Sequence, residues 1–161
     1  MNVKRLLPFA LLAALFLLGA CARTAVPAET ESPEEEIVNT ESEESSMKLF
    51  IGDTEVSVRW EENESVDALR ALASEAPLTV SLSMYGGFEQ VGSLGTRLPR
   101  NDVQTVTEAG DIVLYAGNQI VVFYGSNSWA YTRIGKITGL SGQELTALLG
   151  SGDVTLTIRL D

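Results

Sequence analysis

Three residues in one apolar stretch combine a cation with two aromatic rings at a spacing of two. They are Trp129, Tyr131 and Arg133, and alternate residues of a strand point to the same face of a sheet. A guanidinium beside aromatic rings can bind a π face or donate hydrogen bonds to a peptide amide. We therefore treat all three as candidate ligand-binding residues, and Arg133 also as the candidate catalytic residue. The competing interpretation places both rings on an outer rim and pairs Arg133 with an acid.

Other candidate residues lie upstream, around glycine turns. Tyr85 and Phe88 flank the glycine pair at 86–87, so they could line a cleft, although such residues also serve as core and turn residues. Arg97 and Arg100 are further candidate donors to an amide. The acidic residues of this region lie mostly at predicted turns and helix starts, where capping accounts for them. Paired carboxylates for glycoside hydrolysis are therefore not indicated.

The absent residue types exclude several functions. The chain has one cysteine and no histidine, which excludes Ser-His and Cys-His catalysis, a disulfide framework and most zinc and haem sites. We expect no metal and no cofactor. Eleven basic residues against 22 acidic ones give a formal net charge of −11. Binding to nucleic acid is not expected, because no basic patch could release phosphate counterions.

Cys21 follows a short apolar segment in the pattern of a bacterial export signal. Residues 6–18 are apolar and follow two basic residues, but they are too short to span ~30 Å of hydrocarbon, which needs about 20 helical residues. Residues 18–21 (Leu-Gly-Ala-Cys) resemble a lipobox, the processing site of bacterial lipoproteins. This resemblance implies cleavage before Cys21 and lipidation of its thiol. The alternative is an ordinary secretory signal ending in the Ala-Cys-Ala of 20–22.

The segment after Cys21 is acidic and contains almost no large apolar side chains over residues 22–46. Such a composition buries too little surface to offset its ordering entropy. We expect a disordered spacer, with a docking site for a cation or partner as the alternative. The expected organisation is a signal peptide at 1–20, a lipidated cysteine and linker at 21–46, and one domain at 47–161. The lipid would anchor the domain in the cell envelope, at the cell membrane or outer membrane, facing outside the cytoplasm.

Short strands make up most of the predicted domain. The dipeptide Gly52-Asp53 between the first two strands indicates a type I′ hairpin turn. Two later strands are continuously apolar, which predicts burial on both faces, and Tyr115 and Tyr124 are expected to face each other in the core. Residues 99–109 are a predicted loop. The predicted strands cover residues 47–51, 54–60, 78–84, 88–98 (irregular), 112–115, 119–124, 129–134 and 154–160.

Two short helices are predicted near 65–75 and 142–149. Asn63 or Ser65 caps the first, and residues 141–144 (Ser-Gly-Gln-Glu) form a capping box for the second. About eight short strands with frequent turn signals indicate a mainly β fold. Closure into a barrel would remove exposed sheet edges. We therefore expect a monomeric, closed eight-stranded β-barrel with two short helices rather than a sandwich.

Three stretches of the domain carry a family resemblance. They are residues 84–89 (Met-Tyr-Gly-Gly-Phe-Glu) with Leu-Pro at 98–99, residues 109–115 with 122–124, and residues 131–137 before 150–153. Together they resemble the small prokaryotic cyclophilin-like domain family over nearly all of the domain. The resemblance implies a closed eight-stranded barrel with a helix at each end. The active-site motifs of the isomerases in the wider family cannot be matched here residue by residue.

The resemblance implies two functions of different classes. True cyclophilins are peptidyl-prolyl isomerases, in which an apolar-aromatic pocket holds the proline while an arginine donates to the twisted amide. A weak isomerase acting on exported proteins is therefore one expectation. A shared fold is weak warrant for shared chemistry, so we favour a non-enzymatic module that binds a peptide, a small ligand or a protein. The candidate binding residues are Tyr85, Phe88, Arg97, Trp129, Tyr131 and Arg133.

Overall fold

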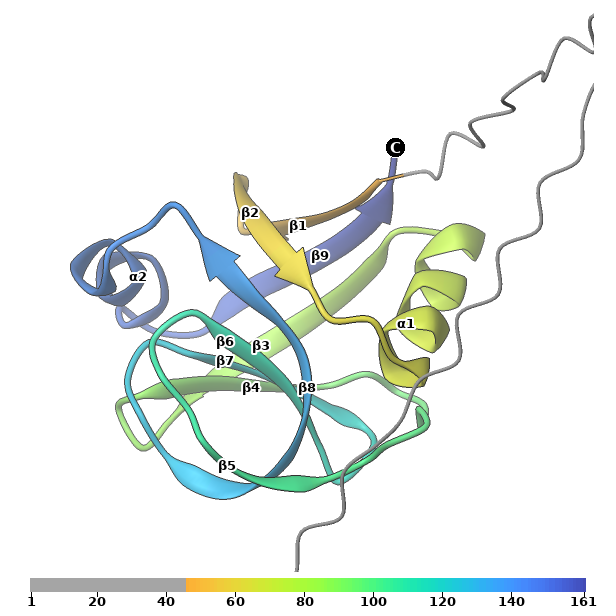
Figure 1. Ribbon diagram of the computed structural model, residues 1–161. Helices are drawn as coiled ribbons and strands as arrows, with labels where there is room; N and C mark the ends of the chain where they lie inside the picture. Colours follow the sequence, from red (N-terminus) through yellow and green to blue (C-terminus); the bar gives the residue numbers. More distant parts are fainter. Residues whose placement is uncertain (1–45) are drawn as a thin grey trace, which may run out of the picture. The chain divides into compact units, whose positions relative to one another are not determined.

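The computed structural model describes residues 46–161, which form nine strands and two helices (Figure 1). Cys21 and the predicted signal segment lie outside the described residues, as does nearly all of the predicted linker. Within residues 46–161 no helix is long and apolar enough to cross a membrane. The elements are β1 (Met47–Ile51), β2 (Thr54–Trp60), α1 (Glu64–Glu75), β3 (Leu78–Tyr85), β4 (Glu89–Ser93), β5 (Val103–Val106), β6 (Asp111–Tyr115), β7 (Gln119–Phe123), β8 (Ser128–Thr138), α2 (Gly142–Leu149) and β9 (Val154–Leu160).

Eight of the strands close into an antiparallel barrel, which confirms the predicted fold class. Their order is β2-β1-β9-β3-β4-β7-β6-β8, and the pairing of β8 with β2 closes the ring. Strand β5 lies outside the ring and pairs with β8 (Figure 1). The closed ring therefore has no free edge, and β5 is the edge strand of the described domain.

Both helices begin at predicted capping residues. The Asn63 side-chain oxygen accepts hydrogen bonds from the backbone N–H groups of Ser65 and Val66 at the start of α1. At the start of α2, Ser141 and Glu144 form the predicted capping box. These side chains satisfy backbone donors that have no partner within the helix.

Strand pairing extends beyond the predicted boundaries around β8. This strand runs from Ser128 to Thr138, past the predicted end at 134, and pairs with β2, β5 and β6. Strand β5 lies within the predicted loop 99–109, and its side chains are mostly exposed. Its sequence therefore lacks the alternation of buried and exposed residues from which a strand can be predicted. Its position instead follows from pairing with the long neighbouring strand.

The turn between β1 and β2 also differs from the prediction. Gly52 has a positive φ of +57°, but Asp53 does not have a positive φ. A type I′ turn requires positive φ at both central residues, so that prediction was wrong. A glycine at the first central position is the preference of the type II′ turn, which gives the same two-residue hairpin between Ile51 and Thr54.

Apolar side chains pack on both faces of β6 and β7, as the continuous apolar runs predicted. One face joins the main core, to which these strands contribute Ile112, Leu114, Ile120 and Val122. The other face belongs to a second, smaller cluster, which we call the outer cluster. It consists of Val113, Val121, Phe123 and Tyr131, with Phe88 and Val91 packed against it. Because both of their faces are closely packed, β6 and β7 hold the side chains on the outside of the barrel in fixed positions.

Candidate functional site

A hollow of about 330 Å³ lies beside the outer cluster, with which it shares three residues. Its walls come from the end of β3, the start of β4, the β6–β7 hairpin, the segment before β8 and the start of β8. Its volume is within the range of small-ligand pockets. We call it the aromatic cleft, because three tyrosines and one tryptophan line it. The lining residues are Tyr85, Glu89, Val91, Tyr115, Gln119, Val121, Asn127, Trp129 and Tyr131.

Tyr131 is the most firmly held aromatic residue of the cleft. Its ring is buried and packs edge-to-face on Phe123, with 5.7 Å between centroids, and on Tyr115 at 6.0 Å. Its hydroxyl accepts a hydrogen bond of 3.0 Å from the Asn127 side-chain amide. Burial, and then the neighbouring Glu89 carboxylate, raise the pKa of Tyr131, so its phenol stays protonated at neutral pH. This ring is a pre-positioned wall rather than an adaptable surface.

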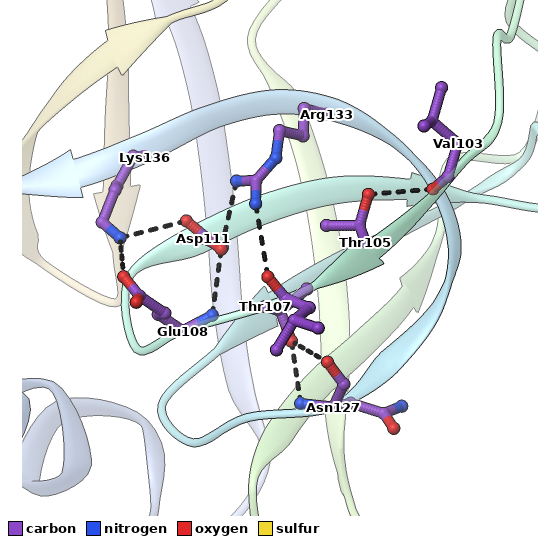
Figure 2. Close-up of polar contacts among 9 residues, drawn as sticks. Val103, Thr105, Thr107, Glu108, Asp111, Asn127, Arg133 and Lys136 are labelled. Atoms are coloured by element: carbon purple, nitrogen blue, oxygen red, sulfur yellow. Dashed lines mark hydrogen bonds and ion pairs between the residues drawn. The ribbon is translucent and has the colours of Figure 1, made fainter.

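Asn127 is itself held in place by hydrogen bonds to a buried threonine. Thr107 is fully buried, and its hydroxyl accepts from the Asn127 backbone N–H at 2.9 Å (Figure 2). The same hydroxyl also donates to the Asn127 carbonyl at 3.1 Å. The loop before β8 is thereby tied to the segment before β6, which holds the amide of Asn127 against Tyr131.

Glu89 is the one carboxylate of the cleft. It is the first residue of β4 and pairs with Tyr85 on one side and Phe123 on the other. The residue is only 7% exposed, and its Oε2 is buried with no hydrogen-bond partner. Burial raises the pKa of the Glu89 carboxyl, because desolvation penalises the charged form. Among residues 46–161, no arginine or lysine lines the cleft to compensate that charge.

Two aromatic residues at the cleft are largely exposed. Tyr85 is 67% exposed and Trp129 is 57% exposed. Large aromatic side chains are costly to leave in water, and clustered exposure of this kind is typical of interaction sites. The fold thus brings three of the candidate residues, Tyr85, Trp129 and Tyr131, together at one hollow.

Arg133 lies outside the aromatic cleft. Its Nη1 is 3.1 Å from Oδ2 of Asp111, which is 1% exposed, and its Nη2 donates to the Val106 carbonyl at 3.4 Å (Figure 2). The same carboxylate accepts from the Glu108 backbone N–H and lies 3.2 Å from the Lys136 ammonium. Arg133 is thus engaged by an acid, and with Tyr131 it borders a separate groove along β5.

The remaining candidates are also placed away from the cleft. Arg97 donates to the Ala116 carbonyl at 3.0 Å, and Arg100 forms an ion pair with Asp102. Phe88 packs against the outer cluster. Its ring would lie only 2.4 Å from a Cβ at Gly86, so the glycine there makes room for the ring. Within residues 46–161 no group of three or more acidic or cysteine side chains is arranged to hold a metal ion.

Sequence reasoning missed Tyr115 and Glu89 as cleft residues. Tyr115 is 38% exposed and pairs with Gln119, whereas Tyr124 is buried in the main core. The predicted contact between these two tyrosines across the hairpin was therefore wrong. Strand parity carried a signal, because Tyr115 shares a face with Val113 and Glu89 shares a face with Val91. When both faces of a strand are buried, the sequence pattern does not indicate which face lines the site.

Residues 49–159 match the model of the cyclophilin-like family. Among solved structures, the chain is similar to the solution structure of a hypothetical protein from Archaeoglobus fulgidus. The two are 18% identical, the match covers 71% of this chain and 93% of the other, and the TM-score is 0.48. No curated protein matches the chain.

Proposed function

The chain belongs to the cyclophilin-like family, and from that premise we propose that its domain is a non-enzymatic binding module. It holds a small ligand or a short peptide in the aromatic cleft. The observation that carries the proposal is the exposure of Tyr85 and Trp129 at the edge of a hollow whose other wall, Tyr131, is fixed. Covering those rings with a ligand removes apolar surface from water at about 25 cal/mol per Å². The fixed wall keeps the ordering cost of binding low.

The arginine chemistry of a peptidyl-prolyl isomerase is not supported at this cleft. That chemistry needs a guanidinium that can donate to the rotating amide beside the bound proline. No lining residue is basic. Arg133 contacts Asp111 and the Val106 carbonyl instead, so donating to a substrate would require breaking a contact with a buried acid. These contacts favour a domain that binds a ligand without catalysing isomerisation.

A ligand screen by two-dimensional NMR tests the proposal. The protein is the chain from residue 21 onward with Cys21→Ser, which prevents lipidation. We expect ligands from a mixed library of small molecules and proline-containing peptides to shift amide signals around Trp129. Tyr85→Ala and Trp129→Ala should each weaken binding tenfold or more, because aromatic contacts dominate such sites. Met84→Ala is the matched control, since Met84 is exposed on the same strand but does not line the cleft.

A protease-coupled isomerisation assay on a proline tetrapeptide separates the two function classes. Uncatalysed exchange takes tens of seconds or longer, so modest acceleration would be visible. We expect no acceleration. Acceleration that Arg133→Ala abolishes would overturn the binding module in favour of an isomerase acting on exported proteins.

We further propose that the domain is held at a membrane by lipid on Cys21. Support comes from the lipobox-like residues 18–21 and the short apolar stretch before them. Two or three acyl chains would anchor the protein stably, because each buried methylene is worth about 0.8 kcal/mol. Intact mass spectrometry of the native protein should show a chain that begins at Cys21 and carries lipid. An unmodified chain beginning at Ala22 or Ala25, or a soluble secreted form, would contradict the anchor.

A further inference from the structure

The only charged residue that lines the aromatic cleft, within residues 46–161, is acidic. Glu89 contributes a carboxylate with a buried, unpartnered oxygen, and no basic residue lines the cleft. The chain as a whole carries a formal charge of −11. A cation entering the cleft would meet attraction at long range from the chain and at short range from the Glu89 carboxylate in the cleft wall, whereas an anion would meet repulsion from both.

The aromatic rings reinforce this preference for a cation. The faces of tyrosine and tryptophan rings carry negative electrostatic potential, and cations bind over them with about 2 kcal/mol or more where water is displaced. Tyr115 and Tyr131 line the cleft in edge-to-face contact with each other, with 67° between their ring planes. The exposed rings of Tyr85 and Trp129 lie at the same hollow.

Hydrogen-bonding capacity narrows the class of cation. A primary ammonium brings three N–H donors that each need an acceptor. Glu89 supplies the one carboxylate among the lining residues, and the Tyr131 hydroxyl already accepts from Asn127. Other side-chain acceptors in the lining, on Gln119, Tyr85 and Tyr115, are neutral. A quaternary ammonium has no N–H to satisfy, so ring faces and one carboxylate match its needs in full.

We propose that the aromatic cleft is a cage for a quaternary ammonium group, with Glu89 as its counter-charge. This inference rests on the proposed function, because it names the class of ligand that the cleft binds. The volume of about 330 Å³ accommodates such a head group together with a short chain. Binding also supplies the charge partner that the Glu89 carboxylate lacks in the empty cleft.

Choline and its neutral carbon analogue, 3,3-dimethylbutan-1-ol, provide the decisive comparison. The two molecules share shape and differ in charge. The chain from residue 21 onward with Cys21→Ser is titrated with each by calorimetry. Trp129 fluorescence is followed in Trp60→Phe, which removes the other of the two tryptophans. We expect choline to bind and to change Trp129 emission, and the analogue to bind at least tenfold more weakly.

A matched pair of substitutions locates the charge. Glu89→Gln should weaken choline binding tenfold or more and leave binding of the neutral analogue unchanged. Glu62→Gln is the control, because Glu62 is exposed and does not line the cleft. Equal binding of choline and its analogue, or loss of both in Glu89→Gln, would overturn the cation cage while leaving a binding cleft in place. If neither probe binds and the NMR screen also yields no ligand, both this inference and the proposed function fail.

Two sources of the same head group are then distinguished. Vesicles of phosphatidylcholine present the quaternary ammonium at a lipid surface, whereas free choline presents it in solution. Co-sedimentation with the vesicles that free choline competes away would identify a lipid head group as the ligand. Binding of free choline without co-sedimentation would identify a soluble organic cation. Phosphatidylglycerol vesicles, which lack the ammonium group, are the control and should not co-sediment with the protein.

Discussion

Glu89 on β4 and Asp111 on β6 are both buried carboxylates, but their electrostatic environments differ. Asp111 accepts from the Glu108 backbone N–H and lies within 3.2 Å of both Arg133 and Lys136 (Figure 2). Asp111 Oδ1 and Glu89 Oε2 are both buried without a hydrogen bond. The Asp111 oxygen has the Lys136 ammonium beside it, whereas among residues 46–161 no cation lines the cleft of Glu89. Both side chains are less than a tenth exposed. The described domain therefore places two cations beside one buried acid and none beside the other.

This difference separates a structural role from a binding role. A buried charge persists when fixed partners offset its desolvation, and Asp111 has three such partners that join β6, β8 and the loop before β6. An uncompensated acid costs stability in the empty protein, and such groups occur preferentially at functional sites. Glu89 is also bordered by exposed aromatic rings, whereas Asp111 is covered by its own partners. We infer that the Asp111 cluster supports the fold and that the Glu89 cleft serves a ligand.

Replacing Asp111 should give the largest effect. Asp111→Asn removes the charge that Arg133 and Lys136 share, and leaves both cations beside a neutral amide. Because the two cations are partly exposed and can hydrate, we expect a loss of about 3 kcal/mol in the free energy of unfolding, at the lower end for broken buried pairs. Urea unfolding at pH 7 measures it.

The exposed turn residue provides the control for that measurement. Asp53→Asn makes the same chemical change at an exposed position, where surface substitutions usually stay within about 0.5 kcal/mol. Equal losses in the two variants would show that the Asp111 cluster contributes no more than an ordinary surface acid, and the contrast with Glu89 would disappear.

Replacing Glu89 should act in the opposite direction. Glu89→Gln keeps the size of the side chain and removes a charge without a protein partner, so we expect a gain on the order of 1 kcal/mol at pH 7. The gain depends on pH, because burial raises the pKa of Glu89 in the folded protein. As the pH rises above the ordinary glutamate pKa of about 4.3, Glu89 ionises in the unfolded chain at a lower pH than in the folded protein. The contribution of Glu89 to the free energy of unfolding therefore falls as pH rises.

The expected result is a difference curve. The stability of Glu89→Gln minus that of the parent should be near zero below pH 4 and should increase from there towards neutral pH. Glu62→Gln, at an exposed position, should show no such trend. A flat curve for Glu89→Gln would mean that the carboxylate is compensated in solution, which would remove the asymmetry between the two acids.

The barrel was largely predictable from the sequence because its signals are local. Strict alternation at 78–84 and 154–160, capping residues at both helices and glycine turns each specify one element without knowledge of the rest. Strand β5 escaped prediction because its exposed side chains carry no pattern, and pairing with β8 creates it. The end of β8 was misplaced because its residues after 134 belong to the pairing with β2, a non-local contact.

The site was predictable only in part, because it depends on non-local packing. Trp129 and Tyr131 were candidates because of their aromatic type and spacing, and Tyr85 because it flanks a glycine turn; the fold brings the three together. Glu89 and Tyr115 were missed, since nothing local distinguishes an acid facing a cleft from one facing solvent. Arg133 has the same parity as Tyr131 and pairs with Val113, but it lies two residues further along β8, towards Asp111. Its side chain contacts Asp111, outside the cleft.

The smallest expected effect comes from the second cation of the Asp111 cluster. Lys136 lies 3.0 Å from the exposed Glu108 carboxylate and 3.2 Å from Asp111. Lys136→Met keeps the aliphatic stem and removes the charge, while Arg133 still neutralises the buried acid. We expect a loss of about 0.5–1 kcal/mol, as for a partly exposed ion pair, measured by urea unfolding beside Asp111→Asn. A loss as large as that of Asp111→Asn would make Lys136, not Arg133, the main partner of the acid.

The pH dependence of the Lys136 contribution provides an independent check. Hydrogen bonding to Glu108 raises the pKa of Lys136 despite its partial burial, which acts in the other direction. A base with a raised folded-state pKa contributes its full stability below the ordinary lysine pKa of about 10.4, and loses it as pH rises through the higher folded value. The deficit of Lys136→Met should therefore stay constant from pH 6 to about 9.5 and shrink above 10.4. If the deficit already shrank near neutral pH, another group in the cluster would be titrating there. The interpretation that Arg133 and Lys136 are permanently charged partners of Asp111 would then be wrong.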